Sequence, residues 1–332
     1  MSTPLSLRDS HHLGADTVVL SLGGSGRVKK IDVKKIAAAS SSHAITIFDS
    51  TTLKPVKELA NAHADRINEV SFGTCCGDHT IISGSSDGTV KLWDIRQSTP
   101  LLYTLHGNAK NPASSNAIDE VWSVDAVVNR KLAAGTESGG VVVWDWQTLQ
   151  KSTQAFARYD VHTEAVSVVK FGIQFGSSTD PCPESEEPTA RTLLTGSVDH
   201  LVCQIDPTQT EEEDAVLNVL NTEAPVASLG CYHGPMSSLA WVLSTTDIVT
   251  IWDYEKAECL CKHDNLLRHT EADYLAETET GAKSSLPIDY VAGCAWDSRR
   301  SRLLMIGGES STGTAHVFEL PSPAAAANAT GS

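Results

Sequence analysis

Residues 84–88 read GSSDG and match the G-x-S-x-G pattern, in which a serine at a sharp strand-to-helix turn is the nucleophile of a hydrolase. That chemistry requires a helix directly after the serine. Residues 89–93, TVKLW, instead alternate in polarity and are mostly β-branched or aromatic, which predicts a strand. The Asp87-Gly88 pair between two strand-like runs predicts a hairpin turn. We therefore assign Ser86 no catalytic role.

Other residues with chemical potential are not arranged into a recognisable site. Residues 23–26, GGSG, lack the G-K-[ST] ending of a phosphate-binding loop. The eight cysteines contain no C-x-x-C pair, and the 12 histidines are dispersed, so we predict no metal site and no cofactor. No nucleophile, base and orienting group can be assembled, which predicts that the protein is not an enzyme.

The chain has 332 residues and a formal net charge of -16 at pH 7. This charge disfavours binding to nucleic acid or to an anionic membrane and favours partner proteins with basic surfaces. No apolar run is long enough to span a bilayer, and the first residues do not resemble a secretory signal, so we expect a cytoplasmic or nuclear protein, or both. The five basic residues within 27–35 are typical of a nuclear localisation signal or of the exposed face of a strand.

A strand that ends in an aromatic residue and an acidic residue recurs along the chain. Its acidic ends lie 45, 51, 61, 47 and 66 residues apart. The shorter spacings match the period of about 40 to 45 residues of WD repeats, each of which forms one four-stranded propeller blade. The segments are AITIFD ending at Asp49, VKLWD at Asp94, VVVWD at Asp145, HLVCQID at Asp206, VTIWD at Asp253 and TAHVFE at Glu319.

These repeats predict an all-β WD-repeat β-propeller with six recognisable blades. The chain resembles the WD repeat-containing protein 89 family, and the stretches that carry the resemblance are DGTVKLWDIR, PTQTEEEDAVLNV and IDYVAGCAWDSRRSRLLMIGGESSTGTAHVFEL. This resemblance implies a further blade, so an incomplete seven-bladed propeller is the alternative. We expect a flexible N-terminus over 1–14, one propeller over 15–320 and a low-complexity tail over 321–332.

Closure of the ring requires one terminus to complete the sheet that the other terminus begins. We expect the segment TVVLSL, residues 17–22, to be the outer strand of the last sheet. Further hairpin turns are predicted at Ser138-Gly139 and Asp199-His200, and negligible helix is expected outside the insertions. Two insertions, 176–189 and 264–285, and the acidic run 208–215 have the composition of exposed loops, and the acidic run is alternatively a contact for a basic partner.

The resemblance to WD repeats also implies a buried polar chain in each blade. In the second repeat this structural tetrad is His63, Ser83, Asp87 and Trp93. The fourth repeat keeps a partial tetrad of His162, Thr195 and Asp199, but Ile205 replaces the tryptophan. In the third repeat Ala134 and Ser138 stand at the serine and aspartate positions.

Three functions compete. We favour a noncatalytic scaffold for protein–protein interaction, because a ring presents many short loops around one axis. The second is a substrate receptor of a cullin-RING ubiquitin ligase, because residues 81–96 resemble the W-D-x-R box of such receptors, with Asp94 and Arg96 as candidate adaptor-binding residues. The third is a propeller enzyme, which would need a pocket with three converging ionisable side chains outside the tetrads.

Overall fold

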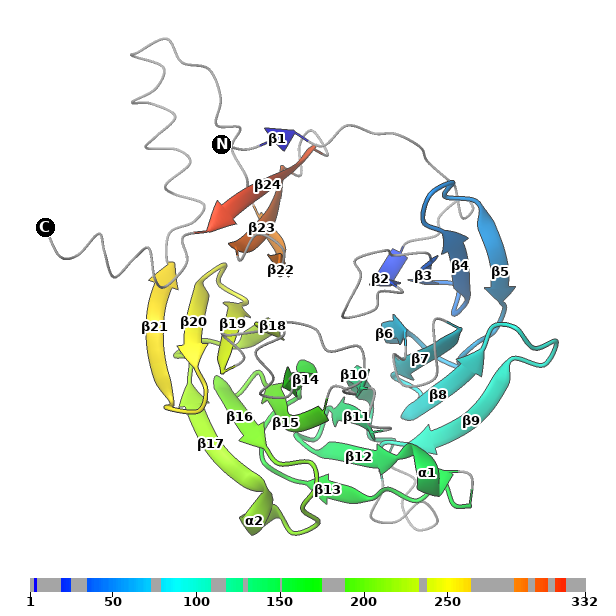
Figure 1. Cartoon of the computed structure of the whole chain (residues 1–332). Coiled ribbons are helices and arrows are strands. Elements are labelled where there is room, and N and C mark those ends of the chain that lie inside the picture. Colours follow the sequence, from blue (N-terminus) through cyan, green and yellow to red (C-terminus); the bar gives the residue numbers. More distant parts are fainter. Residues whose placement is uncertain are drawn as a thin grey trace, which may run out of the picture.

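The computed structural model describes residues 3–4, 19–24, 35–72, 79–108, 118–127, 131–149, 151–174, 189–232, 238–263, 290–297, 302–309 and 314–320. The insertion 264–285, residues 176–188 of the other insertion and the tail 321–332 lie outside these ranges. The described strands form six four-stranded antiparallel sheets, arranged around a central axis as the blades of a propeller (Figure 1). The six-bladed all-β architecture predicted from the repeats is confirmed.

Each blade is a meander in which the first strand lies nearest the axis. The first three blades are β2 (Val19–Gly24), β3 (Lys35–Ser40), β4 (Ile45–Asp49) and β5 (Pro55–Leu59); β6 (Ile67–Phe72), β7 (Thr80–Ser85), β8 (Thr89–Asp94) and β9 (Leu101–His106); and β10 (Val121–Val127), β11 (Lys131–Thr136), β12 (Val141–Asp145) and β13 (Ala157–Tyr159). The next two are β14 (Val168–Gln174), β15 (Thr189–Gly196), β16 (Leu201–Ile205) and β17 (Val216–Asn221); and β18 (Val226–Cys231), β19 (Leu239–Ser244), β20 (Val249–Asp253) and β21 (Glu258–His263). The sixth is β22 (Tyr290–Asp297), β23 (Arg302–Glu309) and β24 (Thr314–Leu320), completed by β1 (Thr3–Pro4).

The closing strand comes from the N-terminus, as expected, but it is not the segment that we predicted. Residues 17–22 were expected to close the last sheet, whereas β2, which begins at Val19, pairs with β3 as the inner strand of the first blade. Thr3 and Pro4, within the expected flexible N-terminus, pair with β24 instead. The error arose because β3, β4 and β5 leave the first blade one strand short. The strand β2 directly precedes them in sequence and completes their sheet.

The sequence patterns account for the local structure. The middle strand β7 is buried along its whole length because it packs against sheets on both faces, while the outer strand β5 is mostly exposed. The three predicted hairpin turns each contain a residue with positive φ, at Gly88 (75°), Gly139 (88°) and His200 (71°). Helix in the described residues is confined to α1 (Trp146–Leu149) and α2 (Glu212–Ala215). No described helix has the length and apolar character of a membrane span.

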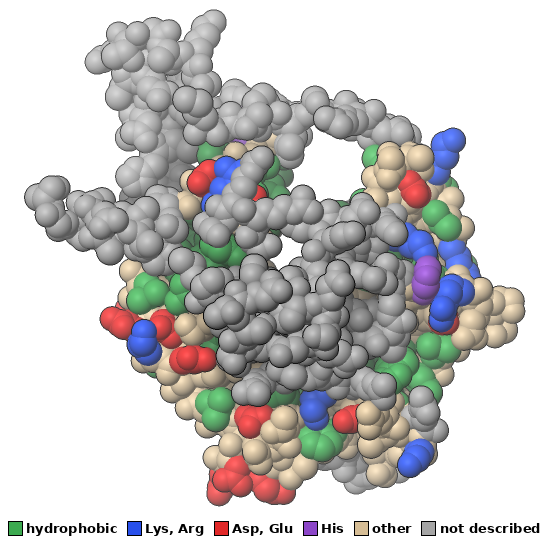
Figure 2. All heavy atoms as spheres, in the orientation of Figure 1, with side chains coloured by type: hydrophobic (Ala, Val, Ile, Leu, Met, Phe, Trp, Pro, Cys, Tyr) green, Lys and Arg blue, Asp and Glu red, His purple; other side chains and the backbone are tan. Residues whose placement is uncertain are grey.

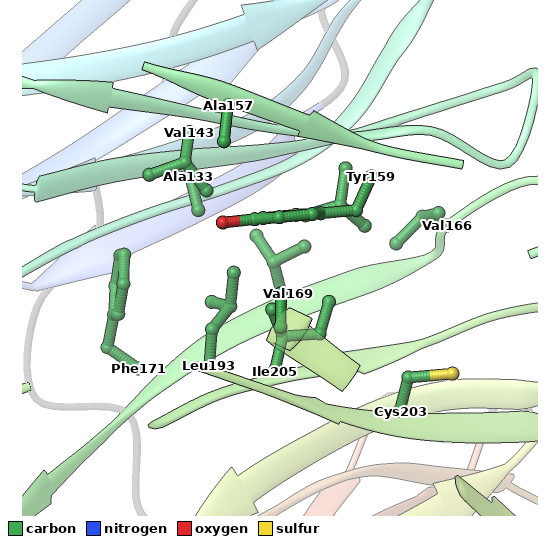
Figure 3. Close-up of a cluster of buried hydrophobic side chains, with 12 residues drawn as sticks. Ala133, Val143, Ala157, Tyr159, Val166, Val169, Phe171, Leu193, Cys203 and Ile205 are labelled. Atoms are coloured by element: carbon green, nitrogen blue, oxygen red, sulfur yellow. The ribbon is translucent and has the colours of Figure 1, made fainter. Parts of the chain in front are cut away.

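Among the described residues the core consists of five clusters of buried apolar side chains, and each cluster joins two consecutive blades. Figure 3 shows the cluster between the third and fourth blades, where Val143 and Tyr159 of one sheet face Val169 and Leu193 of the next. Burial of apolar area of this kind is the main stabilising contribution between sheets. The clusters join the blades in sequence from the first to the sixth.

Candidate functional site

The predicted tetrad residues of the second blade lie together. His63 Nδ1 is 2.9 Å from Asp87 Oδ2, and His63 Nε2 is 2.7 Å from Ser83 Oγ. Trp93 Nε1 donates to Ser83 Oγ at 2.9 Å. The linker before β6 thus connects to β7, to the β7–β8 turn and to β8 through one buried chain of hydrogen bonds. Such a chain favours one arrangement of the blade, because each buried polar group has its partner only there.

Burial and hydrogen bonding determine the charge states of His63 and Asp87. Burial lowers the pKa of His63, and the hydrogen bond and charge of Asp87 only partly oppose that effect. Burial alone would raise the pKa of Asp87, but the hydrogen bonds from His63 and Thr89 outweigh it and lower that pKa. Near pH 7 the aspartate is therefore ionised and the histidine neutral.

Ser86 lies outside this chain of hydrogen bonds. Its Oγ accepts from Asn68 Nδ2 at 3.1 Å, whereas His63 contacts Ser83. The segment after Ser86 is β8, a strand, and not the helix that a nucleophilic serine of this motif requires. The G-x-S-x-G match therefore belongs to a hairpin turn.

The fourth blade brings its three partial-tetrad residues together. His162 Nδ1 is 3.1 Å from Asp199 Oδ2, and His162 Nε2 is 2.9 Å from Thr195 Oγ1. Burial lowers the pKa of His162, as it does for His63. Ile205, at the tryptophan position, is fully buried in the cluster shown in Figure 3. Apolar packing replaces the missing indole hydrogen bond there.

The third blade contains a network that the sequence analysis missed. Arg158, on the outer strand β13, has a side chain only 12% exposed, and its Nη2 lies 3.2 Å from Asp119 Oδ2. The same Nη2 donates to Ser138 Oγ at 3.0 Å, and Nη1 donates to the Gly107 carbonyl at 2.8 Å. Arg158 thus connects the β11–β12 turn to the linker before β10. The tetrad connects the corresponding turn and linker of the second blade. An arginine between the strand residues Ala157 and Tyr159 was the only signal for it in the sequence.

The candidate adaptor-binding residues form a local ion pair after β8. Arg96 Nε and Nη2 donate to the two carboxylate oxygens of Asp94 at 2.9 and 2.7 Å. The aspartate side chain is 8% exposed and the arginine side chain 60% exposed. Hydrogen bonds from Arg96 hold the pKa of Asp94 well below its usual range. This bidentate pairing fixes the guanidinium in one orientation at the surface.

Three ionisable side chains, Glu69, Asp125 and Lys170, come together on the inner strands, outside the tetrads. Two of them are carboxylates that accept backbone N–H groups of the following blade: Glu69 Oε2 from Val124 at 2.7 Å, and Asp125 Oδ2 from Phe171 at 2.8 Å. The third, Lys170, is paired with Glu69. Ser21 Oγ likewise accepts from Val70 N at 3.1 Å. Ser21, Glu69 and Asp125 thus connect inner strands of consecutive blades, and the pair of Lys170 with Glu69 connects the fourth blade to the second.

Other predicted features can be placed more briefly. The acidic run 208–215 contains α2, whose acidic side chains gather at the edge of the molecule (Figure 2). In the described part of the chain, five cysteines are free thiols and no group of three or more His, Cys, Asp or Glu side chains is placed to hold a metal ion. Residues 27–34 of the basic stretch lie outside the described ranges.

Comparison with known proteins finds sequence similarity to several WD-repeat proteins. The chain is 27% identical over 284 residues to the WD repeat-containing protein 89 homolog of Dictyostelium discoideum, covering 85% of this chain and 67% of that protein. It is 25% identical over 235 residues to WD repeat-containing protein GTS1 of Arabidopsis thaliana, covering 70% and 53%. It is 29% identical over 148 residues to DDB1- and CUL4-associated factor 10 of Homo sapiens, covering 43% and 24%. No family model matches the chain.

Solved structures agree on the fold. A chain of the mitotic checkpoint complex superposes with a TM-score of 0.64 at 17% identity, covering 93% of this chain and 76% of that one. The β-propeller domain of Myceliophteria thermophila Cps50 (Swd1) gives a TM-score of 0.63 at 12% identity, covering 91% and 83%. The chain spans about two thirds of the Dictyostelium relative and about half of the Arabidopsis relative.

Proposed function

We propose that this WD-repeat β-propeller, which resembles the WD repeat-containing protein 89 family, is a noncatalytic scaffold that binds other proteins. The observation that carries the proposal is the engagement of Glu69, Asp125 and Lys170. Glu69 and Asp125 each accept a backbone N–H group of the following blade, and Lys170 pairs with Glu69 two blades away. What the ring offers to other molecules is its outer surface and its loops, which suit recognition.

The partner is expected to present a basic surface. The net charge is -16, and the exposed residues of α2 and its N-cap add four carboxylates at one edge, Glu211, Glu212, Glu213 and Asp214. Charge attraction of this kind accelerates association and weakens as salt rises. Crosslinking in native extract at low and at high salt tests the proposal. We expect protein partners that are lost at high salt, and recovery of no partner at either salt concentration would contradict it.

The second candidate function is binding to a cullin-RING ligase adaptor through Asp94 and Arg96. Two observations favour it: the exposed, fixed guanidinium of Arg96, and the similarity to a protein named as DDB1- and CUL4-associated. An arginine held by a buried carboxylate can present its remaining donors to a partner without losing further side-chain freedom.

Purified DDB1 provides the test of this second candidate. We expect Arg96→Ala to weaken binding about tenfold, a loss of about 1.4 kcal/mol, while the melting temperature stays unchanged. The matched control is Lys256→Ala, because Lys256 makes the corresponding ion pair with Asp253 in the fifth blade and is 71% exposed. If wild-type protein does not bind DDB1, or if both variants bind as the wild type does, the adaptor function is excluded and the general scaffold stands.

A further inference from the structure

The inner strand of the first blade has exposed apolar side chains on the face that points away from the second blade. Buried apolar side chains fill the five described interfaces between consecutive blades. The inner strands of the second to fifth blades each present an apolar residue to the preceding blade, and these residues are at most 2% exposed: Val70, Val124, Val169 and Leu229. The corresponding residue of the first blade is Leu22, which is 66% exposed. Val19, on the same strand, is 43% exposed. No cluster of buried apolar residues joins the first and sixth blades in the part of the chain that is described.

The sixth blade is exposed on the opposing side. In the first four blades, the second strand presents a fully buried residue to the following blade: Ala37, Ile82, Ala133 and Leu194. The corresponding residue of the fifth blade, Trp241, is 7% exposed, whereas that of the sixth blade, Ile306, is 37% exposed. Its cross-strand partner Val317 is only half-buried. Figure 1 shows the first and sixth blades standing apart, and we call the space between these two faces the seam.

The outer edge of β24 adjoins the seam, and among the described residues it is paired at two positions. All seven residues of β24 pair with β23 on its inner side. On its outer side, β1 pairs at two positions, Thr3 with Val317 and Pro4 with His316, and Pro4 has no N–H to donate. In the other blades the outer strand pairs with its neighbour at three to five positions. An exposed strand edge of this kind is a template for a further strand.

We propose that the seam is an interaction surface for an extended segment of a partner protein, which adds to β24 as an antiparallel strand in place of β1. The inference rests on the proposed scaffold function and specifies which kind of segment the partner protein presents. Main-chain hydrogen bonds to β24 supply affinity, and alternate side chains of the segment supply specificity.

The register of β24 defines the segment. Side chains opposite Ala315, Val317 and Glu319 lie on the seam face, because these three residues alternate with His316 and Phe318, which face the fifth blade. Apolar side chains fit opposite Ala315 and Val317, where they extend the apolar face of the sixth blade. A basic side chain fits opposite Glu319, whose side chain is 55% exposed although its carboxylate pairs with Arg302.

A second copy of this chain is a poorer occupant than such a segment. It would bring a net charge of -16 against the same charge, which opposes association. A short segment with basic ends carries the opposite charge and needs only the edge and the apolar face beside it. The proposal therefore commits to a basic, apolar-alternating strand.

The test uses the full chain and a fluorescein-labelled peptide, Lys-Thr-Val-Thr-Val-Thr-Lys. We expect saturable binding by fluorescence anisotropy, with hydrogen-exchange protection confined to residues 314–320 and their neighbours in the sixth blade. Val317→Arg should weaken binding about tenfold or more, because it places a cation on the apolar face. Deletion of residues 1–4 should tighten binding about threefold or more, because β1 no longer occupies the edge.

Matched controls separate strand addition from other binding. Val219→Arg changes a 50% exposed valine on the outer strand β17 and should leave binding unchanged. Two further peptides carry N-methyl groups on their odd-numbered and on their even-numbered residues, respectively. Only one of these peptides should lose binding, because only alternate residues of an added strand donate their backbone N–H groups to β24. Val317→Thr, which keeps the β-branched shape, serves if the arginine variant does not fold.

Four results would overturn the inference. The first is no binding of the unmodified peptide, the second is hydrogen-exchange protection outside the sixth blade, and the third is equal binding of the two N-methylated peptides. The fourth is a concentration-dependent dimer of the chain that Val317→Arg abolishes, which would assign the seam to a second copy. If the peptide fails while salt-sensitive partners are still captured from extract, the scaffold function stands and only the seam proposal falls.

Discussion

Lys170 Nζ lies 3.1 Å from Glu69 Oε1, so an ion pair joins the fourth blade to the second and passes the third. The two side chains are 30% and 25% exposed, and Asp125 of the third blade adds a second negative charge near the lysine. Burial alone would lower the pKa of Lys170, but attraction to Glu69 and Asp125 outweighs it and raises that pKa. One cation thus couples three inner strands that are far apart in sequence.

Lys170→Met should therefore destabilise the protein by about 1 to 3 kcal/mol, because it leaves two carboxylates near the axis without their cation. Urea unfolding measures the loss. A double-mutant cycle with Glu69→Gln isolates the pair, and we expect a coupling energy of about 0.5 to 3 kcal/mol. Strict additivity of the two single changes would show that the pair does not couple the blades.

Asp87→Ala should lower the free energy of unfolding by about 1 to 3 kcal/mol, since it leaves His63 without its partner and weakens the β7–β8 turn. Asp65→Ala is the control, because Asp65 is exposed on the neighbouring linker, and its effect should stay within about 0.5 kcal/mol. Denaturation midpoints compare the two variants. An unchanged midpoint for Asp87→Ala would argue that the tetrad contributes nothing to stability.

Acid should destabilise the protein below about pH 6.5, the ordinary pKa of histidine. Burial lowers the pKa of both His63 and His162, so below that pH the unfolded chain binds protons that the folded protein does not. The stability they contribute is complete above the unfolded pKa and is lost as pH falls toward the folded pKa, by up to about 1.4 kcal/mol per pH unit for each histidine.

Urea midpoints measured between pH 7.5 and 5.5 check this dependence. The double variant His63→Gln and His162→Gln should flatten the profile, whereas His106→Gln, which changes an exposed histidine on β9, should leave it steep. The opposite trend, with greater stability at pH 5.5 than at pH 7.5, would contradict the neutral state of the two buried imidazoles.

Two N-terminal deletions distinguish the roles of β1 and β2. Removing residues 1–18 takes away β1, the short outer strand that pairs with β24, and leaves β2 in place. Removing residues 1–24 also takes away the inner strand of the first blade and the hydrogen bond from Val70 N to Ser21 Oγ. We expect the longer deletion to lower the melting temperature clearly more than the shorter one, because it opens a sheet on its axial side. Equal melting temperatures would show that β2 is dispensable.

The error at the N-terminus shows where sequence reasoning reached its limit. Residues 17–22, TVVLSL, are rich in β-branched and apolar residues, as a strand often is, and that composition is the same whether the strand lies at the axis or at the rim. Only the pairing partner distinguishes the two positions, and the partner is β3. The two-residue strand Thr3–Pro4 is too short for any periodic signal.

The sequence by itself determined the blades, because each repeat carries its strand alternation and its turn residues within a short stretch, as at Asp87 and Gly88. The contacts between blades were decided only by the tertiary structure. Arg158 reaches Asp119, Lys170 reaches Glu69, and Leu22 stays exposed where its counterparts are buried. These relationships join positions up to 101 residues apart, and no local pattern specifies which side chains a ring of sheets brings face to face.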